Sequence, residues 1–130
     1  MILVAEDNEI NQMVIEYTLR DAGYEFVIVE NGKLAVEQFQ SIRPALILMD
    51  VSMPEMNGME ATAAIRELEN GTDAHVAIIA LTAHALHGDR EKFLEAGMDD
   101  YMPKPISPKV LTERLVEWLN PGLHQENLSA

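Results

Sequence analysis

Residues 46–58 read LILMDVSMPEMNG, so a run of large apolar residues ends at Asp50 and is followed by a Met-Pro turn and an Asn-Gly pair. An apolar run of this length between turn signals predicts a strand that is buried on both faces of a parallel sheet. Asp50 would then lie where the strand leaves the core, at the edge where ligands bind in open α/β sheets. An Asp in this place, taken alone, more often only starts a turn, so the interpretation depends on the other strands.

Apolar strands and amphipathic helices alternate along the whole chain. Strands are expected over residues 2–5, 26–29, 46–50, 76–81 and 98–102. Helices are expected after the cap Asn8, over about 34–43, 59–69 and 86–96, and after the cap Ser107. Right-handed crossovers between such units give a parallel sheet with helices on both faces. We therefore expect an α/β fold.

The composition indicates one acidic domain. The 130 residues include 22 Asp and Glu against 9 Lys and Arg, and there is no cysteine. We expect a domain over residues 1–120 and a flexible tail over residues 121–130. The acidic balance argues against direct nucleic-acid binding, and no apolar run reaches the roughly 20 residues that span a bilayer. The N-terminus lacks the basic region of a signal peptide, so we expect a cytoplasmic protein without direct membrane contact.

Polar side chains follow four of the expected strands, at the rim where the carboxyl ends of parallel strands lie together. These side chains are Glu6, Asp7, Asp50, Thr82 and Lys104. Two carboxylates about 4 Å apart repel by roughly 4 kcal/mol at an effective dielectric of about 20, so a positive group is required nearby. Lys104 is one candidate. A hard divalent cation is the other, and oxygen ligands without His or Cys favour Mg²⁺ or Mn²⁺.

A carboxylate beside a divalent cation, a hydroxyl and an ammonium is suited to phosphoryl transfer. Asp50 can attack phosphorus and form an acyl phosphate, while the cation, Thr82 and Lys104 stabilise charge on the phosphoryl oxygens. The sequence contains neither the Gly-rich dinucleotide fingerprint nor the nucleotide-binding loop with its Lys-Ser/Thr pair. A hydride-transfer or nucleoside-triphosphate function therefore has no support.

Four motifs in order resemble those of the response-regulator receiver domains of two-component phosphorelay systems. They are Glu6-Asp7, residues 49–58 around Asp50, Thr82-Ala83 and Lys104-Pro105. Each motif is weak alone, but four in sequence, each at a strand end, are specific, and the resemblance covers residues 2–119. It implies a flavodoxin-like fold whose five parallel strands have the order 2-1-3-4-5.

The resemblance also implies how the acceptor and the metal are arranged. Asp50 resembles the phosphoacceptor, and Asp7 resembles the direct Mg²⁺ ligand. Glu6 would act mainly through metal-bound water, and Ser52 would offer its backbone carbonyl to the metal.

The remaining site residues resemble the parts of a conformational switch. Thr82 resembles the switch hydroxyl, Lys104 resembles the phosphate-binding lysine, and Tyr101 lies where the family has an aromatic rotamer switch. The peptide bond between Lys104 and Pro105 is similar to one that is cis in the family. Phosphorylation would then draw Thr82 inward, let Tyr101 turn, and change the partner surface formed by the fourth helix, the last strand and the last helix.

By the same resemblance, the phosphoryl group would come from a phosphohistidine of a histidine kinase or of a histidine phosphotransfer protein. The domain would catalyse its own aspartyl phosphorylation and dephosphorylation within a phosphorelay and would not be a metabolic enzyme. Residues 5–12, AEDNEINQ, are similar to the receivers of hybrid histidine kinases. The chain is then either a stand-alone regulator or the cytoplasmic receiver of a longer, membrane-bound hybrid kinase. The sequence does not name the downstream target.

Other interpretations fit part of the pattern. A phosphatase with an aspartyl nucleophile usually has a second Asp two residues further on, where this chain has Ser52. A pseudo-receiver, which only binds partners, is expected to have lost an acid, the Thr or the Lys, and none is missing. His84 and His87 are three residues apart and could pair on a metal, but the histidines of the chain are otherwise scattered, so this interpretation is disfavoured. Trp118 is expected to lie in the core rather than on a partner surface.

Overall fold

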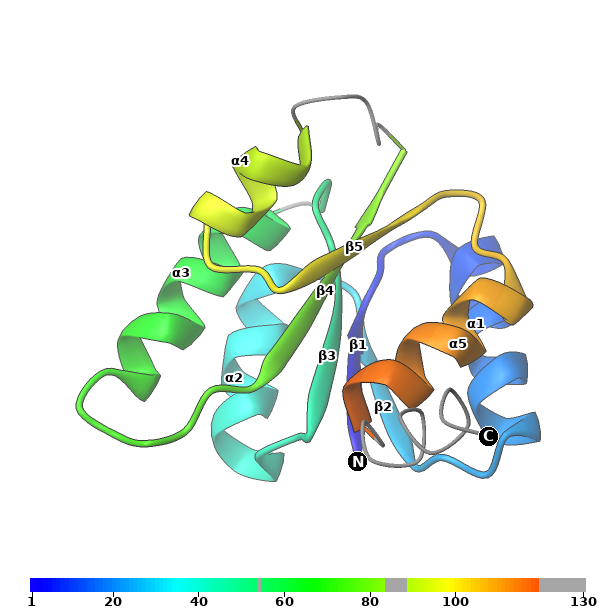
Figure 1. Cartoon of the computed structure of the whole chain (residues 1–130), viewed down its shortest axis with the longest axis horizontal. Helices are drawn as coiled ribbons and strands as arrows, with labels where there is room; N and C mark the ends of the chain where they lie inside the picture. Colours follow the sequence, from blue (N-terminus) through cyan, green and yellow to red (C-terminus); the bar gives the residue numbers. More distant parts are fainter. Residues whose placement is uncertain (54, 84–88, 120–130) are drawn as a thin grey trace, which may run out of the picture.

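Five strands and five helices alternate in the computed structural model, which describes residues 1–53, 55–83 and 89–119. In chain order they are β1 (Ile2–Ala5), α1 (Glu9–Asp21), β2 (Phe26–Val29), α2 (Gly32–Ile42), β3 (Leu46–Asp50), α3 (Gly58–Glu69), β4 (Ala77–Thr82), α4 (Asp89–Glu95), β5 (Asp100–Pro103) and α5 (Pro108–Leu119). Figure 1 shows the sheet between two helical layers, with α1 and α5 on one face and α2, α3 and α4 on the other. The predicted α/β class is confirmed. Among the described helices, none has both the length and the apolar character of a membrane-spanning segment.

Three sequence-based predictions lie outside the described residues. They are the start of the fourth helix near residue 86, the histidine pair at 84 and 87, and the tail over residues 121–130.

All neighbouring strands are parallel, and their order is β2-β1-β3-β4-β5, as the resemblance implies. In the register, Ala5 pairs with Met49, and Met49 pairs with Ala80. The strands that carry the polar residues therefore end at one rim. β5 starts at Asp100, later than predicted, because the carboxylate of Asp99 rather than a strand carbonyl accepts the amide of Ile78 at 2.8 Å.

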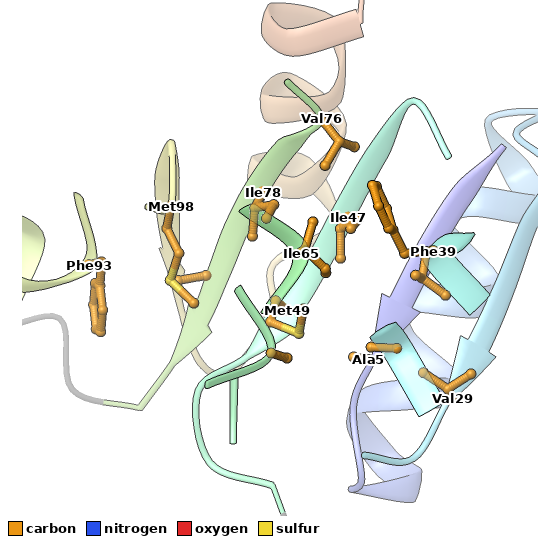
Figure 2. Close-up of a cluster of buried hydrophobic side chains, with 14 residues drawn as sticks. Ala5, Val29, Phe39, Ile47, Met49, Ile65, Val76, Ile78, Phe93 and Met98 are labelled. Atoms are coloured by element: carbon orange, nitrogen blue, oxygen red, sulfur yellow. The ribbon is translucent and has the colours of Figure 1, made fainter. Parts of the chain in front are cut away.

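The core lies in two layers, one on each face of the sheet. Ile47 and Met49 point into the layer covered by α2 and α3, whereas Leu46 and Leu48 point into the layer covered by α1 and α5. Figure 2 shows Ile47 and Met49 in the first of these layers, together with Phe39 of α2. β3 is thus buried on both faces, which is why its sequence is apolar at consecutive positions rather than alternating.

The loop after β3 brings α3 close to Asp50. The side chain of Asn57 accepts the amide of Glu60 at 2.9 Å, and the Glu60 carboxylate accepts the amide of Asn57 at 3.1 Å. The apolar pattern predicts a helix from residue 59, but this capping box starts it one residue earlier, at Gly58. A Cβ at Gly58 would collide with the carbonyl oxygen of Asp50. Glycine is therefore required where α3 begins against the end of β3.

The prediction that Trp118 lies in the core is wrong. Leu111 and Leu115 fill the core from the inner face of α5, but the side chain of Trp118 is 37% exposed. Its Nε1 donates a hydrogen bond of 2.9 Å to Oδ2 of Asp100, and Arg114 lies 3.3 Å from the same oxygen. The indole therefore joins the end of α5 to the start of the edge strand β5.

Candidate functional site

Three carboxylates converge at the carboxyl edge of the sheet. Glu6 and Asp7 follow β1, and Asp50 ends β3; one oxygen of each lies within 4.8 Å of the others. The side chains of Glu6 and Asp50 are 0% and 1% exposed, whereas Asp7 is open to solvent. The acids that the sequence predicts at one rim are therefore close enough to share a cation.

Amide groups hold the two buried carboxylates in place. Oδ1 of Asp50 accepts the backbone amide of Ser52 at 3.0 Å. Oε1 of Glu6 accepts the backbone amide of Asn8 at 3.1 Å and Nδ2 of Asn11 at 3.3 Å. The loop after β3 thus orients Asp50, and the beginning of α1 orients Glu6.

Lys104, one of the two positive groups that the sequence offers for these acids, lies beside them. Its Nζ lies 2.9 Å from Oδ2 of Asp50 and 3.2 Å from Oε2 of Glu6. The backbone amide of Lys104 donates to the carbonyl oxygen of Thr82 at 2.8 Å, and the following bond to Pro105 is cis. The hydrogen bond to the end of β4 therefore holds Lys104 beside the acids.

The surroundings of Asp50 make its carboxyl group hard to ionise. Burial raises the pKa of Asp50 to about 6, and the charge of Glu6 adds to this effect against the opposing influence of Lys104 and of the Ser52 amide. Burial acts to lower the pKa of Lys104, but the neighbouring carboxylates of Asp50 and Glu6 outweigh it and raise that pKa above its usual value. One ammonium therefore offsets only part of the negative charge at this rim.

The carboxylate oxygen atoms at this rim suit a hard divalent cation. Oε2 of Glu6 and Oδ2 of Asp50 are buried and have no aligned hydrogen-bond donor among the described residues, although Nζ of Lys104 is at ion-pair distance from both. With Asp7 beside them, the donor set consists of oxygen only, which matches Mg²⁺ or Mn²⁺. Ser52 contributes its amide to Asp50, and a metal contact by its carbonyl stays a prediction.

A cavity of about 260 Å³ opens beside Asp50 and has room for a phosphoryl group. Thr82 and Lys104 line it from the ends of β4 and β5, and Phe93 lines it from α4. The ring of Tyr101 is half-buried, and its centroid is 6.3 Å from that of Phe93. Of the two predicted switch residues, Thr82 therefore lines the cavity itself, whereas Tyr101 packs near Phe93, which lines it.

Sequence reasoning missed three contributions to this site. Asn11 orients Glu6, and Lys92 and Phe93 of α4 line the cavity. The acidic and basic residues around Lys92 are typical of a solvated helix face, so the local pattern gave no signal for it. Asn11 lies in the segment AEDNEINQ, where a polar side chain soon after an acidic pair was the available signal.

The chain matches the family model of the response regulator receiver domain over residues 2–116. It belongs to this receiver-domain family. The receiver of hybrid signal transduction histidine kinase I from Dictyostelium discoideum is 50% identical over 117 residues, which is 86% of this chain and 7% of that protein. The chain thus spans a small part of that kinase, and the predicted similarity to hybrid-kinase receivers is confirmed.

Two solved receiver structures have the same fold. The receiver domain of sensor histidine kinase PA1611 from Pseudomonas aeruginosa PAO1, described with a magnesium ion in its active site cleft, is 48% identical with a TM-score of 0.80 over 90% of this chain and 94% of that chain. The receiver domain of Ssk1 from Saccharomyces cerevisiae, crystallised with the histidine phosphotransfer protein Ypd1, is 34% identical with a TM-score of 0.84 over 90% of this chain and 86% of the matched chain. The fold implied by the resemblance is confirmed.

Proposed function

We propose that this receiver domain is a phosphorylation-activated signalling switch, in which Asp50 accepts a phosphoryl group from a phosphohistidine of a histidine kinase or phosphotransfer protein. The observation that carries the proposal is the buried carboxylate of Asp50, 2.9 Å from Nζ of Lys104 and at the wall of a cavity of about 260 Å³. The complex of the Ssk1 receiver with Ypd1 supports this class of donor.

The carboxylates of Asp7 and Asp50 would hold Mg²⁺ or Mn²⁺, with Glu6 acting through metal-bound water and Ser52 through its backbone carbonyl. The cation would neutralise the acids and stabilise charge on the phosphoryl oxygens. The buried oxygens of Glu6 and Asp50 that lack aligned donors support this assignment, as does the magnesium ion in the PA1611 receiver.

The reaction itself requires little from the protein beyond orientation and charge. A carboxylate oxygen of Asp50 forms a bond to phosphorus while the bond from phosphorus to the donor imidazole nitrogen breaks, and the electron pair returns to the imidazole. No general base is needed because Asp50 attacks in its ionised form. The phosphoryl group carries about −1.5 to −2 of charge at pH 7 in place of the single charge of the carboxylate, and the ammonium of Lys104 is close enough to offset part of it.

The signal would leave the site through Thr82 and Tyr101. Thr82 is buried and lines the cavity, so a hydrogen bond from its hydroxyl to the phosphoryl group would move the end of β4. Tyr101 on β5 packs near Phe93 of α4, and a change in its rotamer would alter the surface of α4, β5 and α5. This is a shift between two populated states that phosphorylation favours unequally.

The donor would dock on α1. Ile10, Met13 and Tyr17 are 71%, 68% and 74% exposed, and their spacing of three and four residues sets them on one face of the helix. α1 begins two residues after Asp7, so this apolar stripe starts at the rim that holds Asp50. A donor with an apolar helix packed along the stripe would bring its histidine to the acceptor.

The test combines two variants with two donors. Asp50→Asn is expected to take up no label from a phosphorylated histidine protein, and uptake at the wild-type rate would remove Asp50 from the reaction. Met13→Glu is expected to slow uptake from the protein donor by about tenfold or more but not uptake from a small acyl phosphate. Leu68→Glu, at an exposed position on α3, serves as the matched control. Equal losses with both donors in Met13→Glu would contradict docking on α1.

A further inference from the structure

A second lysine lines the cavity beside Asp50. The strand ends supply Asp50, Thr82 and Lys104 to the cavity wall, and α4 supplies Lys92 and Phe93. The chain has only 9 Lys and Arg and a net charge of −13, so two lysines at one cavity of about 260 Å³ are a notable share of its positive side chains.

The two lysines are in different situations. Nζ of Lys104 already lies 2.9 Å from Asp50 and 3.2 Å from Glu6, and its side chain is 16% exposed. Lys92 is exposed, and among the side chains described for residues 1–53, 55–83 and 90–119 it has no ion pair. Lys104 is therefore engaged by acids before any phosphoryl group arrives, whereas the ammonium of Lys92 is available to an incoming anion.

We propose that Lys92 is a second phosphoryl-binding cation, which engages the phosphoryl oxygens on Asp50 and thereby ties α4 to the phosphorylated state. The proposal rests on the function proposed above, because it concerns the same acceptor. The phosphoryl group itself carries about −1.5 to −2 of charge at pH 7, which exceeds what one shared ammonium offsets, and Lys92 lines the cavity beside Asp50.

The position of Lys92 in α4 gives this contact a consequence. The next residue, Phe93, is buried, and its ring centroid is 6.3 Å from that of Tyr101. A phosphoryl group that attracts Lys92 therefore acts on the helix turn that packs beside Tyr101. The α4 surface would respond to the phosphoryl group directly, in addition to any route through Thr82.

The experiment measures binding of beryllofluoride, a phosphoryl analogue, to the full chain with saturating Mg²⁺. Lys92→Gln is expected to weaken binding by about two- to fivefold, the range of an exposed ion pair, and Lys92→Arg is expected to restore most of it. Lys109→Gln is the matched control because it removes the same charge from α5, on the opposite face of the sheet. The loss in Lys92→Gln is expected to shrink with added salt, and amide signals of α4 are expected to shift less than in the wild type.

The outcomes separate this inference from the proposed function. If Lys92→Gln and Lys109→Gln bind beryllofluoride equally well, Lys92 does not contact the phosphoryl group and the inference is overturned while the function stands. If Lys92→Gln loses affinity for Mg²⁺ alone to the same degree, the effect belongs to the metal site and the inference is again overturned. If the wild type itself binds no beryllofluoride, the proposed function fails as well. Far-UV circular dichroism of each variant checks that the fold is intact.

Discussion

Replacing Asp50 by asparagine is expected to make the metal-free domain more stable at neutral pH, although it removes an ion pair with Lys104. The side chain of Asp50 is 1% exposed, and its pKa is raised from 3.8 to about 6, first by burial and then by the charge of Glu6. The ionised form is therefore unfavourable in the folded protein compared with the unfolded chain. Asparagine has nearly the same shape and carries no charge.

The magnitude follows from the pKa. A rise from 3.8 to about 6 is roughly two units at about 1.4 kcal/mol each, or nearly 3 kcal/mol. This value already includes the favourable effect of Lys104 on the ionised form, so the expected gain in the free energy of unfolding is on the order of 2 to 3 kcal/mol. The folded wild type holds the Asp50 proton more tightly than the unfolded chain, so its stability falls as pH rises from 3.8 to about 6. Asparagine does not titrate, so the advantage of the variant is small near pH 4 and complete above pH 6.

Urea unfolding followed by far-UV circular dichroism, in EDTA and at about pH 4 and about pH 8, measures this difference directly. Saturating Mg²⁺ is expected to stabilise the wild type more than the variant, because Asp50 is a proposed ligand, and so to narrow the gap. A variant that is less stable than the wild type at about pH 8 in EDTA would refute the reasoning. So would an advantage of the same size at both pH values.

Three further changes test other parts of the structure. Lys104→Ala is expected to bind Mg²⁺ at least as tightly as the wild type but to lose the amide shifts that beryllofluoride produces; an unaltered response would count against the lysine's role. Gly58→Ala is expected to lower the free energy of unfolding by about 1 to 3 kcal/mol, because its Cβ meets the carbonyl oxygen of Asp50, and a near-neutral result in urea would contradict this. Arg66 pairs with Asp99 at 2.9 Å and donates to two backbone carbonyls. Arg66→Ala is therefore expected to lower the free energy of unfolding by about 3 kcal/mol, measured by thermal or urea unfolding. The same change at an exposed arginine on another helix is expected to lower it by less than about 0.5 kcal/mol.

The fold class is predictable because the apolar pattern of each buried strand indicates on which faces the strand is covered. β3 sends Leu46 and Leu48 to one core layer and Ile47 and Met49 to the other, so its apolar residues are consecutive and indicate a sheet covered on both faces. The order of the strands could not be predicted in this way, because no local property of β1 specifies that it lies between β2 and β3. That order came from the family resemblance.

The site is predictable where its residues end strands and unpredictable where helices contribute. Asp50 and Thr82 follow apolar runs, and parallel strands must end at a common rim. Lys92 lies on a helix face with the charge pattern of a solvated surface, and only the packing of α4 brings it to the cavity. Trp118 continues the spacing of inward-facing residues in α5, but its indole finds a hydrogen-bond partner in Asp100 across the surface. Contacts of this kind depend on tertiary structure, which the local pattern does not contain.

The beginning of α1 serves two neighbours at once. The backbone amide of Asn8 and Nδ2 of Asn11 both donate hydrogen bonds to the carboxylate of Glu6. Nε2 of Gln12 donates to the carbonyl oxygen of Glu6 at 2.6 Å. Ile10, at the start of the apolar stripe, belongs to the same turn. Metal binding at the acids and docking of the donor on α1 therefore depend on the same few residues. A coupling between the two does not have to pass through the sheet. The metal-free domain is consequently expected to bind its phosphoryl donor more weakly than the metal-bound domain, before any phosphoryl transfer takes place.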